Sequence, residues 1–339
     1  PLEGKRGILF LERVMFGSTV WIDGVLVGKG DSLSAPHRFD ITDQIRPGEK
    51  QLLTIRVDNR DIHEIGPYPS AYTDETQTIW NGITGAVELQ LEDEVSIKGV
   101  VMQLHAEQRK LKLEFDLDGQ VGEADHVKLI LDGAVLEIKN LSEEKQKRHV
   151  QIETFLPEYI LYWEEANPQL YDMAIELEKA DGECTGRWER KTGFREFRAE
   201  NREIRNNGKP VFLRGNIDCC VYPKTGHPPM DTDSWEKICA VTKEYGLNHI
   251  RFHSWCPPEA AFEAADKAGL YLQIEGPMWM DNWNGYQVGS RQDHYTYLVE
   301  EAKRIVEEYA YHPSFCIFSN GNELNGDFEL LASIVREIK

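Results

Sequence analysis

Two glutamates in the C-terminal third of this chain follow short apolar segments. Glu275 closes residues 270–275, and Asn322 and Glu323 come just after residues 315–318. Short apolar runs are typical of strands covered on both faces of a parallel sheet, and (β/α) barrels carry their chemistry at the carboxyl ends of such strands. One carboxyl that protonates a leaving oxygen, beside a second that meets the anomeric carbon, cleaves a glycosidic bond. These residues therefore favour glycoside hydrolysis.

Further candidates for binding a sugar lie near the ends of the same predicted strands. They are an aspartate, an arginine, a histidine and two tryptophans: Asp218, Arg251, His253, Trp279 and Trp283. Barrel geometry brings strand ends together, so residues far apart in sequence converge. An indole can cover the apolar face of a pyranose while its N–H stays available. We expect these side chains, together with Asn322 and Glu275, to bind the substrate, and Arg214 to support them structurally.

The elements that would position these residues follow from periodicity. From about residue 200 we expect strands at 211–215, 248–252, 270–275 and 315–318, alternating with helices at 234–245, 258–268, 293–311 and 328–339. Gly246 and Gly269 stop the first two helices, and Pro313 follows the third. This alternation predicts a parallel sheet with four βα units, half of a (β/α)8 barrel. A complete barrel typically needs about 250 residues, so we expect the chain to end mid-barrel.

The preceding residues predict two β-rich domains. Asp23-Gly24 and Asp132-Gly133 are strong hairpin signals between alternating apolar segments. Strands separated by turns at this spacing are typical of β-sandwiches. We therefore expect domains at 1–93, 94–199 and 200–339.

Several motifs resemble glycoside hydrolase family 2, the family of β-galactosidases, β-glucuronidases and β-mannosidases. Residues 312–323 (His-Pro-Ser, an apolar strand, then Gly-Asn-Glu) resemble its acid/base motif, and residues 248–251 (Asn-His-Ile-Arg) resemble its second-strand motif. Residues 193–195 (Gly-Phe-Arg) match the exit from its middle domain. The resemblance covers nearly the whole chain. It implies a galactose-binding-like jelly-roll domain incomplete at its N-terminus, an immunoglobulin-like sandwich and the first half of a TIM barrel.

The resemblance also implies roles. Glu323 would be the general acid/base of a retaining exo-β-glycosidase, β-galactosidase-like, and Asn322 would bond the sugar 2-hydroxyl. The family's nucleophile is a glutamate after the seventh strand, which this chain does not reach, so we expect the fragment alone to be inactive. Residues 252–257 (Phe-His-Ser-Trp-Cys-Pro) depart from the family's usual Thr-Ser-His-Tyr-Pro. That departure leaves the identity of the sugar open.

Each candidate also has a plainer interpretation. Glu323 could cap the next helix, and Arg214 and Arg251 could be ion-pair partners that hold the fold together. His253 could be a structural donor, and Glu275 could support a neighbouring side chain. Tyr72 and Trp80, in the late loop of the first domain, could reach the same pocket, although local packing is the favoured interpretation. A non-catalytic carbohydrate-binding protein that keeps the fold is the alternative function.

The composition of the chain limits the classes of molecule that it is expected to bind. The net charge of −20 argues against nucleic acid and anionic membranes, so a glycoside, an oligosaccharide or a polysaccharide is the expected partner, with self-association left open. The spacing of the six cysteines gives no zinc signature or disulfide framework, and we expect mostly buried free thiols. We expect no cofactor and see no cluster that compels a metal. No signal peptide or apolar membrane span is visible, which leaves cytoplasmic, periplasmic and secreted localisation open.

Overall fold

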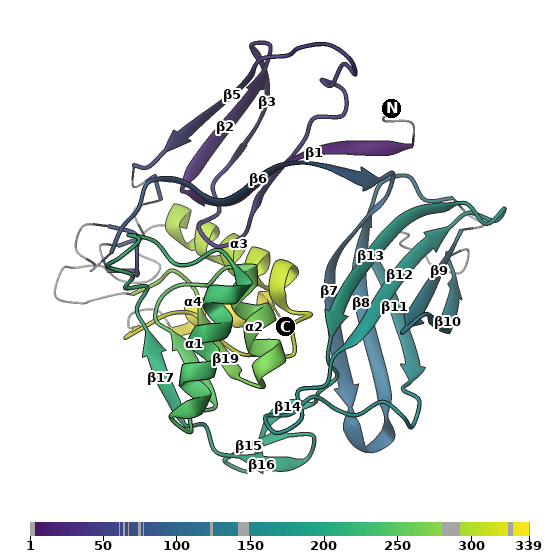
Figure 1. Cartoon of the computed structure of the whole chain (residues 1–339), viewed down its shortest axis with the longest axis vertical. Helices are drawn as coiled ribbons and strands as arrows, with labels where there is room; N and C mark the ends of the chain where they lie inside the picture. Colours follow the sequence, from purple (N-terminus) through teal and green to yellow (C-terminus); the bar gives the residue numbers. More distant parts are fainter. Residues whose placement is uncertain are drawn as a thin grey trace.

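The computed structural model describes residues 4–60, 62–63, 65–66, 68–73, 76, 78–122, 125–141, 149–279, 292–324 and 328–338. Within these ranges the chain consists mostly of β-sheets packed as sandwiches, with four α-helices gathered in its last third. Figure 1 shows three lobes: β1–β6 at the top, β7–β13 at the right, and the helices around the parallel sheet at the lower left. Each described helix is too short or too polar to span a lipid bilayer.

The first lobe contains two antiparallel sheets, with strand orders β4-β1-β6 and β3-β2-β5. Leu11 of β1 and Val20 of β2 belong to one buried apolar cluster that the two sheets share. The hairpin predicted at Asp23-Gly24 is confirmed, because it joins β2 to β3 and both turn residues have positive φ. The strands are β1 (Lys5–Met15), β2 (Gly17–Ile22), β3 (Val25–Gly30), β4 (His37–Asp40), β5 (Leu53–Asp58) and β6 (Gly82–Asp93).

The second lobe is a sandwich of two antiparallel sheets, β10-β9-β12-β13 and β11-β8-β7. Every second residue of β8, from Leu111 to Leu117, points into a core that both sheets share. The hairpin predicted at Asp132-Gly133 is confirmed as the turn from β9 to β10. The elements are β7 (Ser96–His105), the 3-10 helix η1 (Ala106–Gln108), β8 (Lys110–Asp118), β9 (His126–Leu131), β10 (Ala134–Asn140), β11 (His149–Phe155), β12 (Tyr171–Glu178) and β13 (Cys184–Thr192).

A small antiparallel meander, β14 (Phe197–Glu200), β15 (Glu203–Asn206) and β16 (Lys209–Val211), links the sandwich to the helical lobe. The strand predicted at 211–215 is therefore wrong. Asn207 and Gly208 both have positive φ and form the tight turn that returns the chain into β16. Val211 ends that hairpin, Phe212 is exposed, and the first parallel strand begins only at Gly215.

The third lobe is a parallel sheet in the order β17-β18-β19-β20. The predicted strand–helix alternation is confirmed at every unit after β17. Asp231 caps α1 by accepting a hydrogen bond from the backbone of Ser234, and Gly269 ends α2 in the left-handed conformation. The elements are β17 (Gly215–Asp218), α1 (Thr232–Glu244), β18 (His249–Phe252), α2 (Glu259–Ala268), β19 (Tyr271–Glu275), α3 (Gln292–Tyr309), β20 (Phe315–Ser319) and α4 (Phe328–Glu337).

The first lobe is fastened to α3 through a buried carboxylate. Oε1 of Glu301 accepts hydrogen bonds from the backbone nitrogens of Leu33 (2.9 Å) and Ser34 (2.8 Å) and from Oγ of Ser32 (3.1 Å). Glu301 is fully buried. The loop after β3 is thereby held against α3, the helix that precedes β20.

Candidate active site

The carboxyl ends of the parallel strands bring several predicted residues together. Asp218 is the last residue of β17, Arg251 lies next to the end of β18, and Glu275 is the last residue of β19. Asn322 and Glu323 follow β20. Since the four strands are parallel and adjacent, these positions share one edge of the sheet, as expected for the chemistry-bearing end of such folds.

A continuous hydrogen-bonded chain crosses this edge. Nε of Arg251 donates to Oε1 of Glu275 at 2.7 Å, and Nη2 of the same guanidinium donates to Oδ1 of Asn322 at 2.7 Å. Because Arg251 occupies the amide oxygen, the Nδ2 group is the end of Asn322 left to donate to a ligand. Arg251, on β18, thus fixes the orientation of the Asn322 side chain, which lies in the segment after β20.

Both carboxylate oxygens of Glu275 accept hydrogen bonds from other groups of the protein. Gln273 donates a second hydrogen bond to Oε1 at 3.1 Å, and the backbone nitrogen of Ser254 donates to Oε2 at 2.8 Å. The side chain is 1% exposed. A carboxylate that accepts these bonds as well as the Arg251 ion pair is held in one position, and a ligand would have to displace one of these donors to reach it.

A glycine explains the close approach of the segments after β19 and β20. The backbone nitrogen of Asn322 donates to the carbonyl of Met278 at 2.9 Å, and Asn322 forms a parallel bridge with Trp279. A side chain at Gly321 would overlap the carbonyl oxygen of Met278. The glycine of the Gly-Asn-Glu sequence is thus required by backbone packing.

Glu323 is exposed, and its neighbour is an indole. Nε1 of Trp279 donates to Oε2 of Glu323 at 2.9 Å. Glu323 has φ +46°, in the left-handed region that non-glycine residues seldom occupy. Residues held in such conformations are concentrated at functional sites. The structure therefore presents this carboxylate to solvent at the sheet edge, with one oxygen held by Trp279.

His253 completes an aromatic group beside that carboxylate. Its ring meets the Trp279 indole edge to face, with centroids 4.6 Å apart, and Tyr68 approaches the same indole at 5.6 Å. Burial lowers the pKa of His253, although the nearby Glu275 acts in the opposite direction. The imidazole is therefore neutral near pH 7, with a nitrogen able to accept as well as one able to donate.

Asp218 lies at the same edge but is turned toward its own strand–helix connection. Its carboxylate accepts from the hydroxyl of Tyr222 at 2.8 Å and from the backbone nitrogen of Cys220 at 2.7 Å. Burial raises the pKa of Asp218, and these two hydrogen bonds oppose the rise. Trp255 donates to the backbone carbonyl of Asp218 at 3.0 Å.

Three contributors to this edge were missed by sequence reasoning. Ser254, Gln273 and Tyr68 contact Glu275 or Trp279, as described above. Ser254 has positive φ (+52°) and is fully buried. Ser254 lies in segment 252–257, which departs from the family's usual sequence, and that departure could have marked it as a candidate. Gln273 and Tyr68 belong to no motif that would have marked them.

Other predicted residues lie elsewhere. Arg214 precedes β17, so it is at the amino end of the sheet, where it donates to Oε1 of Glu165 at 2.6 Å and to the carbonyl of Gly246. Tyr72 and Trp80 are buried in an apolar cluster that the first lobe shares with the helical lobe. Trp283 lies outside the described residues.

The remaining sequence expectations concern metals and thiols. The described ranges contain no group of three or more His, Cys, Asp or Glu side chains that could hold a metal ion. All six cysteines are free thiols. Cys220, Cys239 and Cys256 are buried as expected, whereas Cys184 is exposed.

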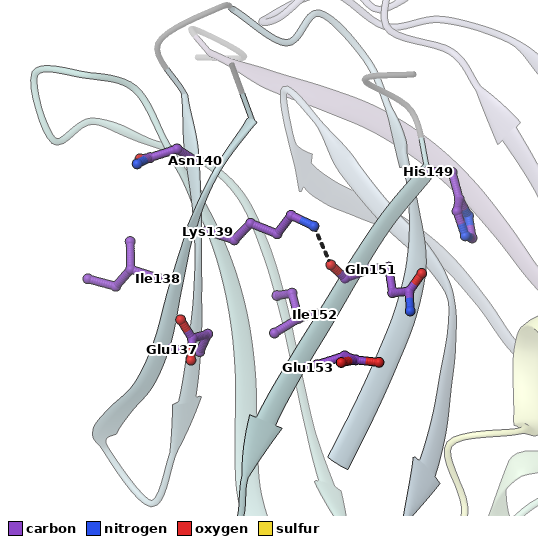
Figure 2. A pocket seen from close by; sticks show the side chains of 8 residues that line it. All are labelled: Glu137, Ile138, Lys139, Asn140, His149, Gln151, Ile152 and Glu153. Atoms are coloured by element: carbon purple, nitrogen blue, oxygen red, sulfur yellow. Dashed lines mark hydrogen bonds between the residues drawn. The ribbon is translucent and has the colours of Figure 1, made fainter. Parts of the chain in front are cut away.

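An open cavity of about 560 Å³ lies in the sandwich, between the edge strands β10 and β11 (Figure 2). Nζ of Lys139 crosses it to the carbonyl of Gln151 at 2.5 Å, which occupies an acceptor on the edge of β11. None of the predicted site residues lines this cavity. It is separate from the edge that holds Arg251, Glu275 and Glu323.

Comparison with known proteins gives consistent matches. Residues 90–195 match the family described as glycosyl hydrolases family 2. A β-galactosidase of Thermoanaerobacter pseudethanolicus is 25% identical over 95% of this chain, and one of Clostridium acetobutylicum is 24% identical over 95%. The chain spans 43% and 36% of those two proteins, less than half of either.

Solved structures show the same architecture. A β-glucuronidase of Parabacteroides merdae superimposes with a TM-score of 0.77 at 20% identity, covering all of this chain and 44% of that one. A β-glycosidase of Bacteroides vulgatus gives a TM-score of 0.73 at 19% identity, again over the whole chain and 43% of the other. The match over residues 90–195 and the sequence relatives support the assignment of this chain to glycosyl hydrolases family 2, and the solved structures show the same fold.

Proposed function

We propose that this chain is part of a retaining exo-β-glycosidase, β-galactosidase-like, in which Glu323 is the general acid/base. One observation carries the proposal. At the edge where the strand ends meet, Glu323 is the exposed carboxylate held by an indole, whereas Glu275 and Asp218 are occupied by protein donors. A carboxyl that must give a proton to a leaving oxygen has to face the substrate.

In the proposed reaction the Glu323 carboxyl protonates the glycosidic oxygen as the bond to the anomeric carbon breaks. A second carboxylate, about 5 to 5.5 Å away, attacks that carbon and forms a glycosyl-enzyme. Water then attacks the same carbon, with Glu323 taking a proton from the water and the second carboxylate leaving. This sequence of two displacements retains the β configuration.

We propose that the second carboxylate comes from a part of the polypeptide that these 339 residues do not include. Glu275 is a poor candidate, because its oxygens accept from Arg251, Gln273 and the backbone of Ser254. Asp218 is a poor candidate because Tyr222 and the backbone of Cys220 occupy it. The relatives' additional length supports this assignment.

The other side chains of the edge would bind and orient the sugar. Asn322, with its oxygen held by Arg251, offers Nδ2 to a hydroxyl oxygen of the sugar. The neutral imidazole of His253 can accept from or donate to a second hydroxyl. Trp279 holds Glu323 through its N–H, and its ring face is suited to the apolar face of a pyranose. We propose the same substrate-binding role for Trp283. For Arg214, which lies away from this edge at the amino end of the sheet, we propose a structural role only.

We further propose a galactose-binding-like jelly-roll domain for residues 1–93, an immunoglobulin-like sandwich for 94–199 and the first four βα units of a TIM barrel for 200–339. The strand orders of the three lobes support this division. The preferred substrate is proposed to be a terminal β-galactoside, because the curated relatives are named β-galactosidases. A terminal β-glucuronide is the second choice, after the names of the solved structures.

The test is hydrolysis of p-nitrophenyl β-D-galactoside, glucuronide, glucoside and mannoside by the natural polypeptide that carries these residues. Turnover that is fastest on the galactoside and is strongly reduced in Glu323→Gln would support the proposal. Glu236→Gln is the matched control, because Glu236 is an exposed glutamate on α1 that pairs with Lys267. Sugar binding without turnover on any substrate would instead favour a carbohydrate-binding protein.

A further inference from the structure

A small cavity lies where the first lobe meets the parallel sheet. Its volume is about 20 Å³, enough for a single water-sized occupant. The first lobe contributes Arg13 of β1, Tyr72 and Trp80 to its wall. Ser254 and Cys256, from the turn after β18, close the other side.

Arg13 brings a buried positive charge to this cavity. The residue is 4% exposed. Its Nη1 donates to the carbonyls of Leu33 (2.8 Å) and Cys256 (3.1 Å). Leu33 and Cys256 both line the cavity, so the guanidinium end of the arginine is located there. Both acceptors are neutral. Among the described residues Arg13 forms no ion pair, although at longer range its charge opposes the rise that burial causes in the pKa of Glu12.

Two donors at the cavity have no acceptor. Nη2 of Arg13 and Nε1 of Trp80 are both buried without a hydrogen-bond partner, and Trp80 is only 9% exposed. Buried N–H groups without acceptors are rare in proteins. Here two such N–H groups belong to residues that line one cavity, and one of them is part of a charged guanidinium. Together they indicate an occupant that accepts hydrogen bonds from both.

We propose that this cavity binds one monatomic anion of the halide class, held between Nη2 of Arg13 and Nε1 of Trp80. An anion accepts from both donors and compensates the buried arginine charge, which neutral acceptors do not. A water molecule would satisfy the donors but would leave the arginine charge without a direct ionic partner. The site is independent of the proposed glycosidase chemistry.

The position of the site predicts what it stabilises. Cys256, whose carbonyl accepts from Arg13, is two residues after Ser254. The backbone nitrogen of Ser254 donates a hydrogen bond to the carboxylate of Glu275. The hydroxyl of Ser254 accepts one from the backbone nitrogen of Ser70 in the first lobe. A halide at this point would therefore strengthen the contact between the first lobe and the turn that supports the carboxyl edge of the sheet.

The first test is crystallographic and uses sodium bromide. Crystals grown in bromide are expected to show an anomalous peak between Nη2 of Arg13 and Nε1 of Trp80. A peak without anomalous signal at that point, or an empty cavity, would overturn the proposal. This measurement needs no substitution, so it does not depend on the folding of a variant.

The second test measures thermal unfolding in sodium chloride and in sodium gluconate of equal ionic strength. The melting temperature of the natural protein is expected to rise with chloride and to saturate, because an ion that binds only the folded state stabilises it. Trp80→Phe, which removes one donor, should require about tenfold more chloride for half of that rise, and Arg13→Met should abolish it. Arg38→Met is the control, because Arg38 pairs with Glu308 on the protein surface. Equal melting temperatures in the two salts at every concentration would contradict a halide site.

Discussion

Nε1 of Trp279 donates a hydrogen bond of 2.9 Å to Oε2 of Glu323, and the backbone of Trp279 forms a parallel β-bridge with Asn322. The segments that follow β19 and β20 are therefore joined by both a backbone bridge and a side-chain bond. With Oε2 held, Oε1 is the oxygen left to carry a transferable proton. The contact makes Trp279 a positioning residue for the proposed acid, in addition to a surface for the sugar ring.

Replacing Trp279 with phenylalanine tests that role. Trp279→Phe keeps an aromatic ring beside His253 and Tyr68 but removes the N–H that holds Glu323. We expect kcat to fall about tenfold on substrates with poor leaving groups, the loss equivalent to one hydrogen bond to a charged group, while KM changes little. Steady-state kinetics on an alkyl and an activated aryl β-glycoside checks this. A rise in KM with unchanged kcat would assign Trp279 to sugar binding alone.

The Arg251–Glu275 ion pair should be essential for stability. Arg251→Met leaves Glu275, which is 1% exposed, without its cation. Breaking a buried pair in this way costs about 3–5 kcal/mol. The double variant Arg251→Met/Glu275→Gln removes the stranded charge and should recover part of that loss. Denaturant unfolding of the natural protein, of Arg251→Met, of Glu275→Gln and of the double variant measures the coupling. Strictly additive losses would show that the pair is energetically unimportant.

His312 should make stability depend on alkaline pH. Its Nδ1 lies 2.6 Å from Oδ2 of Asp266 and its Nε2 lies 3.2 Å from Oε1 of Glu259. Burial by itself would lower the pKa of His312, but the two carboxylates outweigh it and raise the pKa to about 10. A raised pKa means that the stabilisation is complete below the unfolded value of about 6.5 and is lost as the pH rises toward 10.

The measurement for His312 is the free energy of unfolding between pH 6.5 and 10. In the natural protein it should fall by up to about 1.4 kcal/mol per pH unit from this group. His312→Gln should be less stable and should lack that part of the slope. Identical slopes in the two proteins would mean that His312 is neutral in the folded state.

The contribution of His253 to the free energy of unfolding should depend on pH in the opposite direction. Burial lowers its pKa, so the stability it contributes is complete above the unfolded value of about 6.5 and declines as the pH falls through its lower folded value. A ¹³C NMR titration of the imidazole is expected to show it neutral at pH 7 and titrating below 6.5. A midpoint above 6.5 would place a charged imidazole beside Trp279 and Glu323.

Local signals predicted the elements of the helical lobe well. Gly269 ends α2 where its positive φ was expected, and the apolar periods located β18, β19 and β20 within a residue or two. The first parallel strand could not be found in the same way. Its assignment depends on the turn at Asn207-Gly208, which pairs the neighbouring residues with β15 and moves Arg214 to the opposite end of the sheet.

The sequence predicted that several candidate residues share one edge of the sheet, but not how their side chains are hydrogen-bonded. The spacing of Arg251, Glu275 and Asn322 after their strands predicted a shared edge, and the structure places them there. The sequence could not show that Glu275 is occupied on both oxygens, because one donor is a backbone nitrogen at Ser254 in a left-handed turn. The contact between Trp279 and Glu323 likewise depends on a backbone bridge with no local signature.

The most direct test of the central claim is the dependence of hydrolysis rate on leaving group in Glu323→Gln. A general acid contributes about 10²–10⁴-fold to a step that needs proton transfer. In kcat/KM, which reports the step that expels the leaving group, the variant should therefore lose that factor on alkyl β-glycosides but much less on 2,4-dinitrophenyl β-glycosides, whose leaving group needs no proton. Equal losses on both substrates would show that Glu323 is not the acid.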